Sequence, residues 1–346
     1  MLSSNRNFHL FISPTHFRKC QEYGLFGVSE IKMNELANVH KGDIAFFYTT
    51  EKIGSRTVGQ IYGPYEMLSE LFYNDQIVWE PTEQDVTKDK YPFRIKLRLL
   101  REHICTNPIS VQKLWDLKEE DKIKTIMDSS ALINKAVCNL LLGEGTLLLQ
   151  SLIQANQFPK LEEPVYKGHV LEEREVDLFK FKGEGIRRFK MESYLESFLL
   201  RNTLKLHELS GFPAGGNDTY ITDILNQVRT YVAGGAIDIV CLYKKKVINI
   251  PLILSTAVFE LKADVLEKDN VDQLIEYIEW ASRIIPGSNI DMIQGVLVGR
   301  KFGARDEDSK RDLLERIKEF NKVYRIKAYE YEVAQAQRSV TFKRID

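Results

Sequence analysis

The sequence predicts a multidomain α/β protein, with a strand-rich first half and a second half that places helices against a mixed sheet. Three observations support this prediction. The first 105 residues contain short β-rich segments bounded by Gly, Pro, Asp and Lys, and residues 188–333 alternate amphipathic helical patterns with β-rich runs. The third observation is the length, because 346 residues correspond to about two domains of roughly 100–200 residues.

Composition narrows the class of protein. The chain is 44% hydrophobic and 28% charged, and 48 Lys+Arg against 49 Asp+Glu give a net charge of -1. These values indicate a folded protein whose contacts with nucleic acid would be local. The four cysteines stand singly, which fits neither a zinc site nor a disulfide framework. No apolar run approaches about 18 residues, so we expect no membrane segment and a cytoplasmic, prokaryotic-type intracellular location.

The first half is expected to form strands followed by helices. Strands are predicted over residues 7–13, 41–50, 56–63 and 91–100. Helices are predicted over 110–127 and 131–154, the second interrupted at Gly143 and Gly145. In the last strand, Arg94, Lys96 and Arg98 alternate with apolar residues, which predicts a basic face. That face either tracks phosphates or is simply a solvated strand face. Residues 156–186 lose periodicity and gain Pro, Gly and charge. We therefore predict domains at 1–155 and 187–346, joined by a linker.

In the second half, two neighbouring strands bring charged residues together. The predicted elements are a helix at 188–202, strands at 234–243 and 252–264, a helix at 270–285, a strand at 292–300, a helix at 309–323 and a strand at 325–333. Asp238 lies opposite its apolar neighbours on one strand, and Glu260 and Lys262 share a face of the next. Carboxylates placed side by side are costly unless a cation neutralises them, and oxygen ligands suit Mg²⁺, for which Mn²⁺ would substitute.

Two helices are expected to complete this cluster. Gln273 and Tyr277 are four residues apart on one helix, so both can face the same site. Glu192, on the helix that opens this half, borders an apolar stripe and can reach the metal from the other side. Glu196 is a rival on the same face.

The ordered set resembles the PD-(D/E)XK nuclease superfamily, over roughly residues 186–335. The nearest branch is the archaeal and actinobacterial mismatch- and branch-specific (NucS-like) endonucleases, whose helical Glu falls in an E-x-x-L-x-x-x-L-x-x-N pattern. That pattern is matched from Glu192 to Asn202 and favours Glu192 over Glu196, whereas Ile237 replaces the Pro of the superfamily's name. The resemblance implies a metal-dependent endodeoxyribonuclease with Asp238, Glu260 and Glu192 on the metal, and it implies the catalytic set Glu192, Asp238, Glu260, Lys262, Gln273 and Tyr277. The long span from Asp238 to Glu260 predicts an extended hairpin.

The first half resembles the PUA-like β-barrels, especially the EVE branch related to the YTH readers, over residues 7–145. The resemblance rests on ISPTHF, YGLFGV, KGDIAFFY, VGQIYGPY, Trp79 and YPFRIKL, with Phe26 where the family usually has Trp. It implies a barrel with flanking helices and an aromatic pocket for a modified or flipped base. The candidate base-binding residues are Ser13, Tyr23, Phe26, Tyr48 and Trp79. The candidate DNA-backbone residues are Arg94, Lys96, Arg98, Arg187 and Arg188.

Together these features predict a modification-dependent restriction endonuclease, in which the first half selects DNA and the second half cuts it. One alternative is a repair endonuclease acting on mismatched, branched or single-stranded DNA. Another is a catalytically inactive nucleic-acid-binding protein, and RNA stays open as a substrate. Because each chain carries one set of site residues, double-strand cutting predicts a homodimer.

Overall fold

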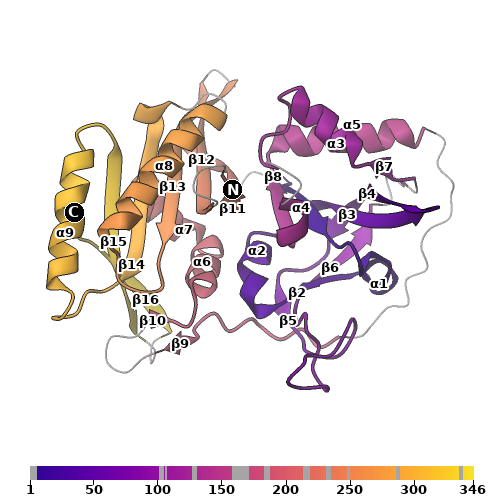
Figure 1. Cartoon of the computed structure of the whole chain (residues 1–346), viewed down its shortest axis with the longest axis horizontal. Coiled ribbons are helices and arrows are strands. Elements are labelled where there is room, and N and C mark those ends of the chain that lie inside the picture. The colour runs from indigo at the N-terminus through magenta and orange to yellow at the C-terminus, as the bar shows by residue number, and fades with distance from the viewer. Residues whose placement is uncertain are drawn as a thin grey trace. The chain divides into compact units, whose positions relative to one another are not determined.

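The computed structural model describes residues 6–100, 105, 107–126, 131–157, 171–182, 188–212, 219–230, 235–247, 250–285, 289–334 and 338–346. The chain divides into two compact units, Met1–Val176 and Asp177–Asp346 (Figure 1). The boundary between the units lies inside residues 156–186, the stretch predicted as a linker.

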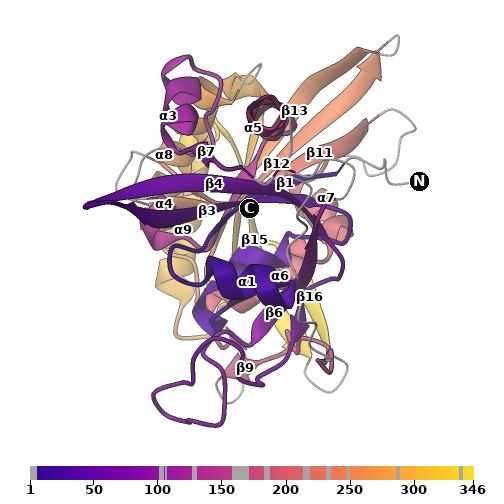
Figure 2. The same ribbon diagram turned by 90° about the vertical axis from the view of Figure 1, so that its right-hand side faces the viewer.

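The first unit is built on one curled, half-barrel sheet. Its strands are β1 (Phe8–Ile12), β2 (Leu25–Val28), β3 (Ile44–Ile53), β4 (Arg56–Met67), β5 (Phe72–Tyr73), β6 (Phe93–Leu99), β7 (Ile109–Ser110) and β8 (Val137–Leu140). The order is β2-β6-β4-β3-β1-β8, with β5 on β6 and β7 on β4. β1 and β3 are parallel, and β3 and β4 form a long antiparallel hairpin (Figure 2).

Helices and a dense apolar core complete this unit. The helical segments are α1 (Phe17–Tyr23), η1 (Glu30–Lys32), α2 (Met33–Ala37), α3 (Gln112–Glu119), α4 (Ala131–Asn134) and α5 (Leu142–Ala155). Leu114 and Leu148, from α3 and α5, pack with Leu10 and Phe46 of the sheet. The helix predicted over 131–154, with an interruption at Gly143 and Gly145, is wrong in its first part, because β8 replaces the helix there and pairs with β1. The interruption is also wrong, since α5 runs through both glycines. A short apolar run has no clear period, and the available partner strand decides its structure.

The second unit contains a six-stranded mixed sheet, which confirms the predicted sheet type. Its strands are β11 (Thr219–Arg229), β12 (Ala236–Val247), β13 (Ile250–Leu261), β14 (Ile293–Arg300), β15 (Arg325–Ala334) and β16 (Ser339–Arg344), in that order across the sheet. β13, β14 and β15 are parallel, and the other pairs are antiparallel. The β12–β13 hairpin pairs as far as Val247↔Ile250, so the predicted extended hairpin is confirmed. β9 (Phe181–Lys182) and β10 (Arg188–Phe189) form a separate small ladder.

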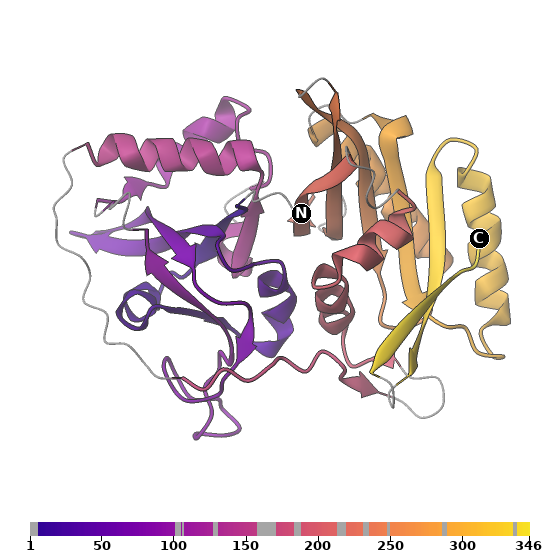
Figure 3. The ribbon, with the colours of Figure 1, turned by 180° about the vertical axis from the view of Figure 1, so that it is seen from behind.

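Helices cover both faces of this sheet. They are α6 (Glu192–Leu200), α7 (Thr203–Ser210), α8 (Lys268–Ile284), η3 (Ile290–Met292) and α9 (Glu307–Phe320). α8 and α9 lie on one face in Figure 1, and α6 and α7 lie on the other in Figure 3. The buried residues of α8, including Val271, Leu274 and Ile278, follow the helical period and turn one face to the sheet. The sequence prediction missed α7, β11 and β16, and β11 proves important for the site.

Candidate functional site

The β12–β13 hairpin places the predicted charged residues next to one another. Antiparallel pairing of Ile239 with Phe259 sets Asp238 across from Glu260, and Lys262 follows directly after β13. The Lys262 Nζ lies 2.5 Å from Glu260 Oε1 and 3.7 Å from Glu192 Oε2. Two strands and the first residue of α6 therefore bring three carboxylates and one ammonium into a single group, which we name the carboxylate–lysine cluster.

Asp238 is held firmly by its neighbours. Its Oδ2 accepts a hydrogen bond from the Leu261 backbone N–H at 2.7 Å, and its Oδ1 accepts one from Gln227 Nε2 at 3.0 Å. Burial raises the pKa of Asp238 to about 6, although the positive charge of Lys262 opposes that shift. The side chain is thus fixed in direction while its negative charge is disfavoured.

Glu260 is the most constrained carboxylate of the cluster. It is only 1% exposed, and burial together with the charge of Asp238 raises its pKa to about 8. Within the described part of the chain, its Oε2 atom is buried and has no hydrogen-bond partner. Burial acts to lower the pKa of Lys262, but the charges of Glu260, Glu192 and Asp238 outweigh it and hold that pKa above its ordinary value.

The two rival glutamates of α6 lie in different surroundings. Glu192 is exposed and approaches Lys262. Glu196 is 2% exposed, and its oxygens accept hydrogen bonds from Asn226 Nδ2 at 3.1 Å and from Gln227 Nε2 at 2.8 Å. Because Gln227 also bonds to Asp238, Glu196 is connected to the cluster through a side chain of β11. Glu192 therefore belongs to the cluster itself, and Glu196 is linked to it through Gln227.

Gln273 and Tyr277 lie on α8 and bond to each other. Gln273 Nε2 donates to Tyr277 Oη at 2.7 Å, and burial raises the pKa of Tyr277 to about 12. A Cβ atom at Gly235 would lie 2.4 Å from Tyr277 Oη, so the glycine before β12 leaves room for the phenol. The charges of Glu260 and Asp238 also raise the pKa of Tyr277, to a smaller extent than burial does.

A divalent cation suits the donors of this cluster, although its ligands are not gathered as a complete set. Among the residues that the structure describes, no three His, Cys, Asp or Glu side chains are grouped as ligands of a metal ion. The buried Oε2 of Glu260 is nevertheless an oxygen without a partner, and Asp238 beside it raises the cost of a second negative charge. A hard cation bound there would satisfy both needs at once.

The first unit contains a pocket of about 310 Å³ at the ends of β1 and β2. It includes three of the five predicted base-binding residues, Ser13, Phe26 and Trp79. Tyr23 and Tyr48 are not among the described residues that line it, so the structure does not bring them together with the other three. Tyr48 instead packs half-buried against the apolar core, because its place on β3 turns it toward that side of the sheet.

The aromatic residues of the pocket are fixed by close packing. Phe26 stacks on Phe11 with ring centroids 4.3 Å apart, which makes it both a pocket wall and a core residue. A Cβ atom at Gly27 would lie 2.8 Å from the Trp79 ring, so only glycine permits this approach. The Cys20 thiol, whose pKa is raised to about 12 by burial, contacts the side chains of Ser13 and Trp79. His16, Lys32 and Tyr91 also line the pocket.

The predicted phosphate-binding residues are largely committed to other partners. Arg94 is fully buried, so its assignment as a backbone contact is wrong. Lys96 pairs with Glu173, Arg98 pairs with Glu66 at 2.9 Å, and Arg188 pairs with Asp264. Arg187 lies outside the described residues. The basic face predicted for β6 is therefore covered at one end and neutralised at the other.

Several site residues escaped the sequence prediction. Asn226 and Gln227 lie on β11, in a stretch read as irregular, and Gln227 has a φ of 52°. Cys20 and His16 line the pocket from α1 and the residue before it. The stretch from Asp223 to Arg229 does not alternate strictly between polar and apolar residues, so the sequence carried no two-residue period that would have marked it as a strand.

The two units thus define a mixed α/β protein with a carboxylate–lysine cluster in one unit and an aromatic pocket in the other. No protein-family model and no curated protein matches the sequence. Among solved structures, a hypothetical protein from Leishmania major is 12% identical, covers 44% of this chain and 98% of its own, and has a TM-score of 0.31. A YTH domain of the Zygosaccharomyces rouxii MRB1 protein, in complex with N6-methyladenosine RNA, is 11% identical and covers 47% and 91%, with a TM-score of 0.26. Likenesses this weak establish no shared fold.

The helices of the described structure can also be compared with membrane-spanning helices. None of the helices described here combines the length and the apolar character that crossing a bilayer requires.

Proposed function

We propose that this protein is a Mg²⁺-dependent DNA endonuclease directed by an aromatic pocket that accepts a base turned out of the duplex. The observation that carries the proposal is the carboxylate–lysine cluster, in which a buried Glu260 oxygen lacks a partner beside Asp238 and Lys262. Structural ion pairs usually satisfy all their polar atoms, whereas functional sites hold groups with perturbed pKa values.

Asp238 and Glu260 would hold the metal, with Glu192 or Glu196 at its edge. When bound, Mg²⁺ would supply Lewis-acid stabilisation and a more acidic water beside a phosphodiester. The hydrogen bonds from Leu261 N–H and Gln227 keep the Asp238 carboxylate aimed in one direction. This orientation is fixed before substrate binds, which is what electrostatic catalysis requires.

Lys262 supplies the positive charge that phosphodiester hydrolysis needs. A water oxygen bonds to phosphorus and gives up one proton to solvent while the bond from phosphorus to the leaving ester oxygen breaks. The leaving oxygen takes up a proton from solvent. The Lys262 ammonium donates a hydrogen bond to the attacking water or to a phosphoryl oxygen, which lowers the energy of the five-coordinate state. Gln273 and Tyr277 form the polar wall beside it.

The pocket of the first unit supplies selectivity, because an active site that contacts the backbone reads no sequence. A cavity of about 310 Å³ bordered by Phe26 and Trp79 can take a planar base. Turning a base out of the stack costs a few kcal/mol, which favours modified or weakly paired bases. If the ligand is a modified base, cutting is directed to modified DNA, and the proposed role is restriction of such DNA.

A cleavage panel tests the proposal. We expect cutting, with Mg²⁺ or Mn²⁺, of a duplex that carries methylated, hydroxymethylated or glucosylated cytosine, and no cutting of the unmodified duplex. The panel also includes mismatched DNA, forked DNA and RNA of corresponding sequence. Cutting of only the mismatched or forked DNA would replace restriction with repair, and binding without any cutting would leave a nucleic-acid-binding protein.

Double-strand cutting needs a second active site, so the proposed form on DNA is a homodimer. Light scattering at the concentration of the cleavage assay measures the mass. A monomeric mass together with intact double-strand cutting would contradict the dimer and leave the nuclease proposal standing.

A further inference from the structure

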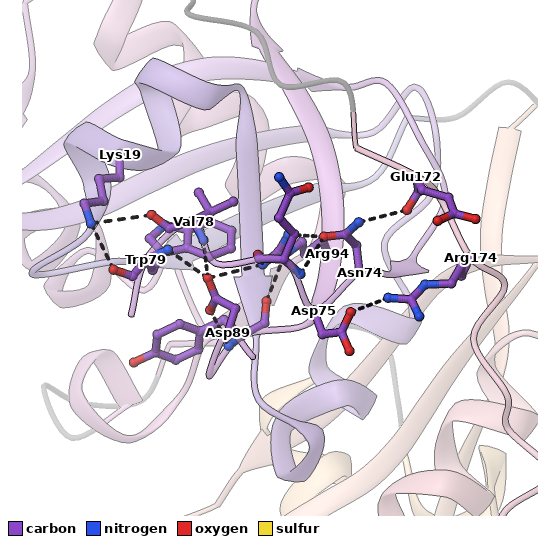
Figure 4. Close-up of polar contacts among 11 residues, drawn as sticks. Lys19, Asn74, Asp75, Val78, Trp79, Asp89, Arg94, Glu172 and Arg174 are labelled. Atoms are coloured by element: carbon purple, nitrogen blue, oxygen red, sulfur yellow. Dashed lines mark hydrogen bonds and ion pairs between the residues drawn. The ribbon is translucent and has the colours of Figure 1, made fainter. Parts of the chain in front are cut away.

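A fully buried arginine stands behind the pocket of the first unit. Arg94, on β6, has no exposed surface, and its guanidinium group is enclosed by the loop between β5 and β6 (Figure 4). Its Nη1 donates to Asn74 Oδ1 at 2.6 Å, its Nη2 donates to the Gln76 carbonyl at 2.6 Å, and its Nε donates to the Tyr91 carbonyl at 3.1 Å. Nη2 also lies 3.2 Å from Asp89 Oδ2.

One side of this group fixes Trp79. Asp89 Oδ2 accepts hydrogen bonds from the backbone N–H of Val78 at 2.5 Å and of Trp79 at 2.8 Å. The Arg94 guanidinium carbon lies 5.1 Å from the centroid of the Trp79 ring. On the α1 side, Lys19 Nζ donates to the Trp79 carbonyl at 2.9 Å. The backbone and the ring of Trp79 are therefore both held by the buried pair Asp89–Arg94.

The opposite side of the group holds the last segment of the first unit. Asn74 Nδ2 donates to the Glu172 carbonyl at 3.0 Å, while Asn74 Oδ1 accepts from Arg94. Arg174 forms an ion pair with Asp75 and a backbone bridge with Tyr73. Arg174 is three residues before Asp177, at which the second unit begins. Asn74 thus joins Arg94 directly to the segment 171–176, through which the chain passes into the second unit.

We propose that Arg94 is the positioning residue of the pocket, and that Asn74 couples the setting of Trp79 to the hold on segment 171–176. The planar guanidinium contacts all sides of the group at once, with Asp89 and Trp79 on one side and Asn74 on the other. A displacement of Trp79 by a bound ligand would disturb the contact of its ring with Arg94, or the bond from its amide to Asp89, which itself pairs with Arg94. Either change would alter the position of the Arg94 guanidinium and so affect Asn74. The Oδ1 atom of Asn74 accepts from Arg94, and its Nδ2 atom donates to the Glu172 carbonyl.

The geometry of arginine explains why this residue type is needed. A guanidinium has five N–H donors in a rigid plane, and Arg94 directs three of its nitrogens to four acceptors. Lysine keeps the positive charge but has a single nitrogen on a flexible stem. Arg94→Lys therefore separates the role of the fork from the role of the charge.

The first test needs no variant. Native-state hydrogen exchange follows the Trp79 amide, which bonds to Asp89, and the Arg174 amide, which bonds to the Tyr73 carbonyl at 3.1 Å. If one group holds both segments, these amides open together and show the same dependence on denaturant. Independent opening of the two amides would overturn the coupling.

The second test changes the group itself, in a background of Trp115→Phe and Trp280→Phe that leaves Trp79 as the only tryptophan. In Arg94→Lys and in Asn74→Ala, we expect the emission of Trp79 to shift to longer wavelength. We also expect the amides of segment 171–176 to exchange about tenfold faster, as for the loss of a hydrogen bond to a charged group. If Arg94→Lys does not fold, Asn74→Ala and the wild-type exchange experiment decide.

Arg174→Ala is the matched control. It removes the ion pair with Asp75 but leaves Arg94, Asn74 and Asp89 unchanged, so segment 171–176 should exchange faster while the Trp79 emission stays as in the wild type. Faster exchange in Asn74→Ala with an unchanged Trp79 spectrum would overturn the proposal. No nucleic acid is used, so failure here and failure of the proposed nuclease are distinguishable.

Discussion

The two units bury charge in opposite ways. In the first unit, Arg94 and Asp89 are almost completely buried, and the three guanidinium nitrogens and both carboxylate oxygens have partners. In the second unit, Glu260 is equally buried, but one of its oxygens has no partner in the described structure. A buried charge that stabilises a fold is satisfied by the fold, whereas a buried charge left incomplete is suited to a ligand.

The direction of the pKa shifts reinforces this difference. Burial lowers the pKa of Arg94 to about 10, against the attraction of Asp89, so the guanidinium is still a cation at neutral pH. The pKa of Glu260 rises to about 8, so its charge is disfavoured at the same pH. At neutral pH the Arg94–Asp89 pair therefore keeps its charged form, whereas the charged form of Glu260 is disfavoured. Four predictions test this contrast.

The largest expected effect is on cleavage. Asp238→Asn and Glu260→Gln should each reduce the cleavage rate by about 100- to 1000-fold or more, because each removes a fixed charge from the reacting centre. Single-turnover rates with Mg²⁺ measure the loss, and circular dichroism verifies the fold. Glu332→Gln is the control, since this exposed carboxylate pairs with Lys301 far along the chain from the cluster. Full activity in both cluster variants would remove the cluster from the mechanism.

The next largest effect is on the stability of the first unit. Arg94→Met leaves Asp89 buried without its cation, and breaking a buried pair in this way costs about 3–5 kcal/mol. Urea unfolding in a Trp280→Phe background, followed by the fluorescence of Trp79 and Trp115, measures the change. Arg98→Met is the matched control on the same strand, because the Arg98–Glu66 pair is exposed and should contribute less than about 1 kcal/mol. Equal effects of the two variants would contradict the importance of burial.

These two arginines also show what sequence could not predict. Arg94, Lys96 and Arg98 alternate with apolar residues, and the strand β6 was correctly predicted from that pattern. Their pattern gives one common face, but the loop that supplies Asn74, Gln76 and Asp89 covers only the Arg94 end of it. The alternation of polar and apolar residues predicts which face of a strand each side chain lies on. It does not predict which residues of a distant loop cover that face.

In the second unit, the sequence predicted more of the candidate site correctly. Asp238, Glu260 and Lys262 were predicted to meet because neighbouring strands with a shared face dictate it, and they do lie together. Gln227 was missed since it belongs to a strand hidden in a polar, glycine-flanked stretch. Val137–Leu140 was misread as helix for a different reason: a short apolar segment takes the structure that its partner strand selects.

A smaller effect is expected at the pocket. Trp79→Leu keeps apolar bulk but removes the aromatic face, so the preference for modified over plain DNA should fall by about 1–3 kcal/mol, the usual value of base stacking. Competition binding with the two duplexes measures this preference. Trp115→Leu is the control, because Trp115 packs against the apolar core and is not among the described pocket residues. An unchanged preference in Trp79→Leu would make Trp79 a core residue only.

The smallest effect tests the electrostatic strain of the cluster without any substrate. The native state keeps a proton on Glu260 up to a pKa of about 8, whereas the unfolded chain loses it near the ordinary value of 4.5. The unfolded state thus binds fewer protons between these values, so Glu260 makes stability fall as pH rises from about 4.5 to 8. Glu260→Gln removes this dependence. In EDTA, it should stabilise the second unit at pH 8 by roughly 0.5–2 kcal/mol relative to the wild type and have less effect at pH 5. Urea unfolding at both values measures the difference, and equal effects at pH 5 and pH 8 would show that the Glu260 carboxylate is not strained.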